Sequence, residues 1–138
     1  MNQHDRAPSF SKTRADHALE SAADYVELIA DLIEETGEAR AVDLAGRLGV
    51  SHVTVSKTLK RLARENLVTA RPYRSIFLTD AGKKLAEDTR ERHRLVLGLL
   101  NALGVPPEVA EQDAEGMEHH VSTTTLQAIE RFLSSGAQ

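Results

Sequence analysis

The sequence predicts a mainly α-helical protein with a small β-hairpin, in which a winged helix-turn-helix precedes a second helical domain. Three observations support this fold class. Apolar residues recur at helical spacing along most of the chain. Two adjoining helical patterns are separated by Gly49-Val50, an arrangement typical of a helix-turn-helix. Two short runs of β-forming residues around a Pro-containing turn then predict a hairpin in the position of a wing.

The composition is that of a soluble globular chain. Its 138 residues, 41% apolar and 28% charged, suffice for one ordinary domain or two small ones that share a core. The absence of Cys excludes disulfides, thiolate zinc sites and thiol nucleophiles. The longest apolar run, Leu95 to Val105, is too short to span a bilayer, and no secretory signal is visible. We therefore expect a cytoplasmic protein with no membrane partner.

Charge is distributed unevenly along the chain. Between Arg40 and Arg94 there are thirteen basic and six acidic residues, so this segment carries a charge of +7. The net charge of the whole chain is −4, so the remaining residues together carry −11. A basic middle with acidic ends suggests a module that binds a polyanion, joined to a part with another task.

The N-terminal part of the chain predicts an arm followed by a helix. Residues 1–20 are polar without a sustained period, so we expect a mobile arm. An apolar stripe predicts the first helix at Ser21–Thr36, with Gly37 as its C-cap. Near the start of this helix, Asp24 and Glu27 are three residues apart. They either complement the helix dipole or project inward to a metal.

The next two helices predict the DNA-contacting surface. A short helix at Ala41–Leu48 precedes a longer one at His52–Glu65, for which Ser51 is a suitable N-cap. Short polar residues lie in its first half, where base edges are read, and basic residues follow, nearer phosphates. The predicted DNA-binding residues of this region are Ser51, His52, Thr54, Lys57, Thr58, Lys60 and Arg61.

A hairpin follows directly. Val68–Arg71 and Ile76–Thr79 are its expected strands, and Arg71 and Arg74 near the tip are expected to contact the DNA backbone or a minor groove. An ordinary surface hairpin is the alternative, but the preceding helix pair favours a wing.

The last part of the chain predicts three helices. A long one runs from Ala81 to about Leu103 and ends in a wide apolar surface, which predicts packing against a second chain in a homodimer. Pro106-Pro107 begins the next helix, and Ser122 caps a final helix at Thr123–Ser134.

Three carboxylates and two imidazoles stand in the eight residues Asp113 to His120. In a helix, Glu115, Glu118 and His119 share one face. Carboxylates packed this closely repel one another unless a cation lies among them, and oxygen and imidazole donors suit Mn²⁺, Fe²⁺ or Zn²⁺. A solvated acidic helix face is the alternative interpretation.

Four segments together resemble the manganese transport regulator branch of the diphtheria toxin repressor family of metal-dependent transcription factors. The resemblance covers about Ala22 to Leu133. Its segments are Asp24-Tyr25-Val26-Glu27, Val50-Ser51-His52-Val53-Thr54-Val55-Ser56-Lys57, Arg92-His93, and Asp113-Ala114-Glu115-Gly116-Met117-Glu118-His119-His120.

The resemblance implies a metal centre and a regulatory role. The implied ligands are Asp24, Glu27, His93, Glu115, Glu118 and His119. In this branch the site is binuclear, with two Mn²⁺ per subunit, and we expect Glu27 and Glu118 as bridges. Carboxylates stand here where the iron-sensing branch has sulfur donors, which favours Mn²⁺, with Fe²⁺ as the alternative. The implied function is repression of manganese uptake genes by a homodimer on double-stranded operator DNA.

The predicted organisation therefore has three parts: a mobile N-terminal arm at residues 1–20, a winged helix-turn-helix DNA-binding domain at 21–80, and a helical metal-binding and dimerisation domain at 81–138. Two alternatives are an iron-responsive repressor of the same family and a winged-helix regulator that senses a non-metal ligand. A third is a dimeric DNA-binding protein whose acids are only a solvated face. A dimetal enzyme is disfavoured because Glu115 and His119 form only one Glu/His pair at helical spacing and no Ser-His-Asp or Gly-rich phosphate motif occurs. We expect no catalytic residues and no small-molecule substrate.

Overall fold

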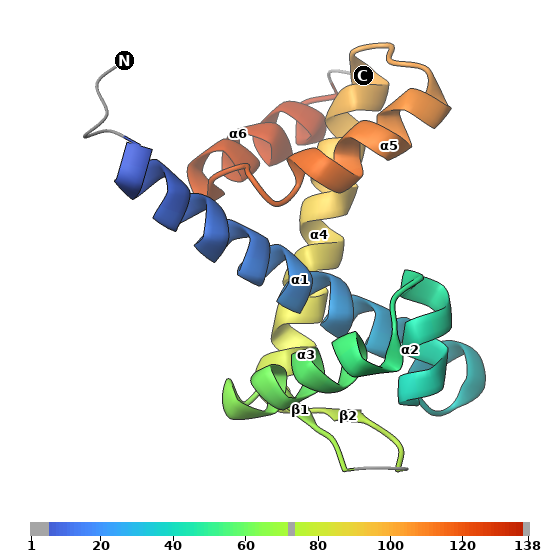
Figure 1. Ribbon diagram of the computed structural model, residues 1–138. Coiled ribbons are helices and arrows are strands. Elements are labelled where there is room, and N and C mark those ends of the chain that lie inside the picture. The colour runs from blue at the N-terminus through green and yellow to red at the C-terminus, as the bar shows by residue number, and fades with distance from the viewer. Residues whose placement is uncertain (1–5, 72–73, 137–138) are drawn as a thin grey trace. The chain divides into compact units, whose positions relative to one another are not determined.

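The computed structural model describes the backbone of residues 6–71 and 74–136, and the side chains of these residues from 21 onward. Within these residues the fold has six helices and one two-stranded antiparallel sheet, which confirms the predicted fold class (Figure 1). The elements are α1 (Arg6–Thr36), α2 (Ala41–Leu48), α3 (His52–Arg64), β1 (Val68–Thr69), β2 (Phe77–Leu78), α4 (Asp80–Ala102), α5 (Pro107–Met117) and α6 (Thr123–Ser134). The chain divides into two compact units, one of residues 18–87 and one that comprises the described residues up to 17 and from 88 onward.

Helix α1 is longer than expected. We placed its start at Ser21, but it begins at Arg6, so that prediction was wrong by 15 residues. Adding a turn to an existing helix costs far less than nucleating one, so a polar segment without an apolar stripe can still continue it. Pro8 stands in the first turn, where its missing N–H leaves no helical hydrogen bond unmade. Residues 1–5 of the predicted arm lie outside the described residues.

The first unit has its own hydrophobic core, built mainly from the apolar stripes of α1, α2 and α3, with Val68 of β1 and Ala86 of α4. Val26 and Ile29 of α1, Leu44 of α2, and Val55 and Leu62 of α3 are fully buried there. These contacts fix α3 against α1 and α2 through its apolar side and leave its opposite face to solvent.

Two capping residues define the turn of the helix-turn-helix. Gly49 adopts the left-handed conformation with φ 67°, which glycine reaches without steric cost, and its N–H donates to the Ala45 carbonyl. Ser51 then caps α3 by accepting a hydrogen bond from the Thr54 amide at 3.2 Å. The turn predicted at Gly49-Val50 and the N-cap predicted at Ser51 are both confirmed.

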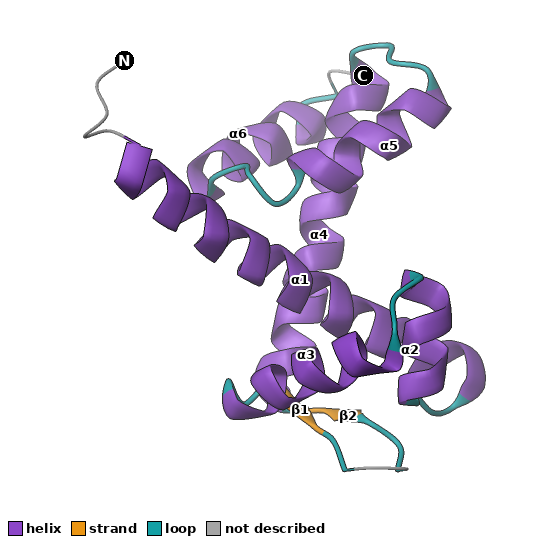
Figure 2. Ribbon diagram, viewed as in Figure 1, coloured by secondary structure: helices purple, strands orange, loops and turns teal. Residues whose placement is uncertain are grey.

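The wing is a short hairpin (Figure 2). Val68 pairs with Leu78 and Thr69 with Phe77 in antiparallel register. Each strand has two residues, so both expected strands were too long. Residues 72 and 73 of the expected turn lie outside the described residues.

The second unit has a separate core at the apolar end of α4, against which α5 and α6 pack (Figure 1). Leu95, Val96 and Leu100 of α4 are buried there with Ala110 and Ala114 of α5. Ser122 caps α6 by accepting from the Thr125 amide at 3.2 Å, as predicted. Among the described residues, no helix is long and apolar enough to cross a membrane.

Candidate metal centre and nucleic-acid interface

The acidic stretch lies on the last turns of α5 and just beyond them. Helix α5 ends at Met117, and Glu118 follows as its C-cap with right-handed helical backbone angles. The Glu118 N–H donates a hydrogen bond to the Ala114 carbonyl oxygen at 3.0 Å. Glu115 and Glu118 therefore keep helical spacing, as predicted. Glu118 and His119 both belong to the turn after α5, so the helix on which the shared face of Glu115, Glu118 and His119 depended ends at Met117.

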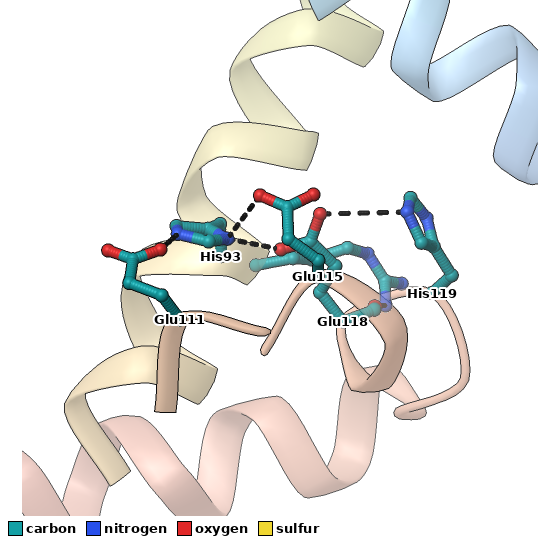
Figure 3. Close-up of polar contacts among 6 residues, drawn as sticks. His93, Glu111, Glu115, Glu118 and His119 are labelled. Carbon is teal, nitrogen blue, oxygen red and sulfur yellow. Dashed lines mark hydrogen bonds and ion pairs between the residues drawn. The ribbon is translucent and has the colours of Figure 1, made fainter. Parts of the chain in front are cut away.

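Three carboxylates surround one imidazole from α4 (Figure 3). His93 Nδ1 lies 2.6 Å from Glu118 Oε2 and 3.7 Å from Glu115 Oε1. On the other side of the ring, His93 Nε2 lies 3.2 Å from Glu111 Oε2. The Glu118 side chain is 1% exposed, whereas those of Glu111 and Glu115 are 59% and 63% exposed. The centre is therefore open to solvent on the α5 side and closed around Glu118.

The neighbouring carboxylates raise the pKa of this histidine. Burial alone lowers the pKa of His93, but the hydrogen bond with Glu118 and the charges of Glu118, Glu115 and Glu111 outweigh it, so the pKa is raised above its usual value. Three carboxyl groups contact or approach one imidazole, so acidic groups outnumber basic ones in this cluster. A buried carboxylate in such a cluster favours a cation beside it.

The donor set fits a divalent cation. One ligand atom each from His93, Glu111 and Glu115 lies within 4.8 Å of the other two. Beside them, His119 Nε2 lies 3.6 Å from Glu118 Oε1, and the His119 side chain is 10% exposed. Imidazole nitrogen with carboxylate oxygen is a combination that takes Mn²⁺, Fe²⁺ or Zn²⁺.

The structure thus brings four predicted ligands together within one unit: His93, Glu115, Glu118 and His119. Asp24 and Glu27 stand three residues apart on α1 in the other unit, the first exposed and the second half-buried. Their membership of the same centre stays a prediction.

Glu111 was missed in the sequence. It stands four residues before Glu115 on α5, and this spacing places both side chains on one helix face. The spacing is visible in the sequence, but Glu111 lies outside the dense stretch Asp113 to His120.

Helix α3 presents one continuous exposed face, opposite its buried stripe. Its members are Val53, Ser56, Lys57, Lys60 and Arg64, at helical spacings of three and four residues. Val53 is 64% exposed, although it is an apolar residue. An apolar residue in the first turn and three cations further along match the arrangement of a helix that reads base edges and contacts phosphates.

The other predicted DNA-binding residues fall into two groups. His52 is exposed on α3, and Arg71 and Arg74 are exposed beside the wing turn. Thr58 and Arg61 are half-buried, and two guanidinium nitrogens of Arg61, Nε and Nη2, are buried without a hydrogen-bond partner among the described residues. The Ser51 and Thr54 hydroxyls contact each other at 3.1 Å in the cap of α3. A DNA contact by any of these residues remains a prediction.

Comparison with known proteins identifies the family. Residues 17–76 match the N-terminal DNA binding domain of iron dependent repressors, and residues 79–137 match their metal binding and dimerisation domain. The chain is 54% identical over 132 residues to the transcriptional regulator MntR of Escherichia coli O157:H7, covering 96% of this chain and 85% of that protein. The chain belongs to the manganese transport regulator branch of the diphtheria toxin repressor family. It is also 38% identical over 109 residues to the regulator MntR of Bacillus subtilis, covering 79% and 77% of the two chains.

Solved structures agree with the family assignment. A manganese-dependent transcriptional repressor in complex with manganese matches with a TM-score of 0.73 and 33% identity, covering 82% of this chain and 52% of that one. The manganese regulator SloR matches with a TM-score of 0.70 and 30% identity, covering 82% and 53%. The chain spans about half the length of these solved structures. As a member of the family, it carries a DNA-binding domain and a metal-binding and dimerisation domain, which confirms a transcriptional regulator and not an enzyme.

Proposed function

We propose that this chain is a manganese-responsive repressor: a homodimer that binds operator DNA upstream of manganese uptake genes when its metal centre is loaded. The observation that supports this most directly is the cluster of His93 with Glu111, Glu115 and Glu118 in the family's metal-binding domain. Its donors are carboxylate oxygens and an imidazole nitrogen, with no sulfur. Such hard donors favour Mn²⁺, whereas sulfur donors favour softer metals.

The proposed ligands are Asp24, Glu27, His93, Glu115, Glu118 and His119, with Glu111 added from its contact with His93. We assign two Mn²⁺ per subunit, which Glu27 and Glu118 would bridge, because the resemblance to the manganese branch implies a binuclear site. When bound, the ions supply the positive charge that the clustered carboxylates lack.

The coupling to DNA follows from where the ligands stand in the sequence. Asp24 and Glu27 belong to α1, which packs against α3 in the first unit through Val26 and Ile29. The other ligands belong to the second unit. Metal binding by ligands of both units would therefore change the affinity for operator DNA. Bound metal raises the operator affinity, and bound operator raises the metal affinity by the same factor, which corresponds to a coupling free energy of roughly 1–3 kcal/mol.

A mobility-shift assay on the promoter region of the protein's own gene tests this function. We expect a shifted band with Mn²⁺ that chelator removes, with Fe²⁺ and Zn²⁺ as comparison ions. A shift with Fe²⁺ alone would support the iron-responsive alternative. A shift that is independent of every metal would support a regulator that senses a non-metal ligand.

Glu111→Gln tests the added ligand. The amide keeps the volume of the side chain but is a poorer donor, so we expect calorimetry to show a Mn²⁺ affinity roughly 10-fold weaker, at the low end of what supporting groups of metal sites contribute. Glu108→Gln is the matched control, because Glu108 is an exposed acid in the first turn of the same helix. Equal affinities of the two variants would remove Glu111 from the centre.

Val53 tests how the operator is read. A valine that is 64% exposed in the first turn of α3 is suited to contact the methyl group of a thymine in the major groove. Replacing that thymine by deoxyuridine removes one methyl, which costs about 0.8 kcal/mol, or roughly four-fold in affinity. We expect wild type to show this loss at one or two operator positions in a thymine-to-deoxyuridine scan, and Val53→Ala to show none.

Arg74→Ala is the contrasting control for this scan. Arg74 is exposed beside the wing turn, so its loss should weaken binding to all sequences, flatten the salt dependence and leave the deoxyuridine pattern unchanged. A scan in which Val53→Ala keeps the wild-type pattern would rule out the methyl contact.

A further inference from the structure

Arg92 precedes His93 on α4 and contacts the turn that follows α5. Its Nη1 donates to the Glu118 carbonyl oxygen at 3.1 Å and to the Val121 carbonyl oxygen at 2.7 Å. Both bonds are part-buried, and both acceptors are backbone groups. Through these bonds the guanidinium holds main chain and leaves the carboxylates of the cluster available.

The two acceptor carbonyls bracket His119 and His120. A helix leaves its last carbonyls without partners, and Glu118 is the C-cap of α5, so its carbonyl needs a donor from elsewhere. Arg92 supplies that donor and, with the same nitrogen, ties the chain again three residues later. A planar guanidinium that bonds both ends of so short a segment leaves it little conformational freedom.

Two neighbouring residues of α4 thus contact the same turn in different ways. His93 approaches the Glu118 side chain, with 2.6 Å between Nδ1 and Oε2, and Arg92 binds the Glu118 carbonyl. We propose that Arg92 is a positioning residue of the metal centre: it fixes the turn at 118–121 against α4, so that Glu118 and His119 stand ready beside His93. This inference rests on the proposed function, because it assigns Arg92 to the support of the same ligands.

The test compares three variants in full-length protein. Arg92→Met keeps a long apolar side chain and removes both hydrogen bonds, whereas Arg92→Lys retains a cation that can reach one carbonyl. Arg94→Met is the control, because Arg94 lies on the same helix, is exposed, and pairs only with nearby Glu91 among its described bonds.

We expect calorimetry to show Mn²⁺ binding roughly 10–100-fold weaker in Arg92→Met, as for other groups that orient metal ligands. Arg92→Lys should lose less, and Arg94→Met should match wild type. In metal-free protein, hydrogen exchange of Arg92→Met should accelerate at 118–122 and stay unchanged elsewhere.

Wild-type Mn²⁺ affinity in a folded Arg92→Met chain would overturn the proposal. If circular dichroism shows that Arg92→Met does not fold, Arg92→Lys decides: weaker Mn²⁺ binding at a wild-type melting temperature supports the role, and unchanged binding overturns it. If the wild-type chain binds no Mn²⁺, the proposed function fails together with this inference. If wild type binds Mn²⁺ and Arg92→Met binds it equally well, only the role of Arg92 fails.

Discussion

Glu118→Gln is expected to abolish Mn²⁺-stimulated operator binding and to leave a folded dimer. Glu118 is the most deeply buried acid of the cluster, at 1% exposure, and it contacts both His93 and His119. Glutamine has nearly the same volume and can still accept a hydrogen bond from His93, so no cavity opens. It lacks the charge, so the loss of Mn²⁺ affinity should exceed the roughly 10–100-fold that supporting residues contribute. Calorimetry and the mobility-shift assay measure the two effects.

Asp113→Asn is the matched control for this variant. It makes the same charge change on α5, and Asp113 is exposed and stands outside the cluster around His93. Its Mn²⁺ response should equal that of wild type. If Glu118→Gln kept metal-dependent operator binding, the assignment of the buried acid as a ligand would be wrong.

The fold was predictable where short-range signals decide it. Gly49, Ser51 and Ser122 mark helix ends through their own backbone preferences or side-chain hydrogen bonds, so the sequence places them correctly. The start of α1 was missed because continuing a helix requires no apolar periodicity. Strand length was overestimated because β-forming residues extend beyond the paired ones.

The candidate site was predictable only in part. Glu115 and Glu118 stand close in sequence, and helical spacing alone places them together. The contact of His93 with them depends on how α4 packs against α5, so it came from the family resemblance. Val53 shows the opposite limit: its apolar side chain predicts burial, but it is 64% exposed on the open face of α3.

Gly82→Ala is expected to destabilise the DNA-binding unit strongly. A methyl group at Gly82 would lie 2.1 Å from the Leu67 carbonyl oxygen and 3.3 Å from Leu78 Cδ2. The oxygen cannot yield, because the same carbonyl accepts the Thr79 amide at 3.1 Å. Overpacking in a fixed surrounding costs typically about 1–3 kcal/mol, and a clash with backbone belongs at or above the upper end. Thermal and urea unfolding of metal-free protein measure the change.

Gly46→Ala provides a control of opposite sign. Gly46 lies within α2, is exposed, and has no heavy atom within 4 Å of an added methyl group, so alanine there should raise stability by about 0.5–1 kcal/mol. Gly82→Ala should also weaken operator binding at fixed Mn²⁺, because Leu67 leads into β1 and Leu78 lies in β2, the two strands of the wing. A Gly82→Ala chain with wild-type stability would mean that α4 can move away from the wing. The position of the hairpin would then depend on its own strand pairing and on the hydrogen bond that the Ile76 N–H donates to the Ala39 carbonyl oxygen at 2.8 Å.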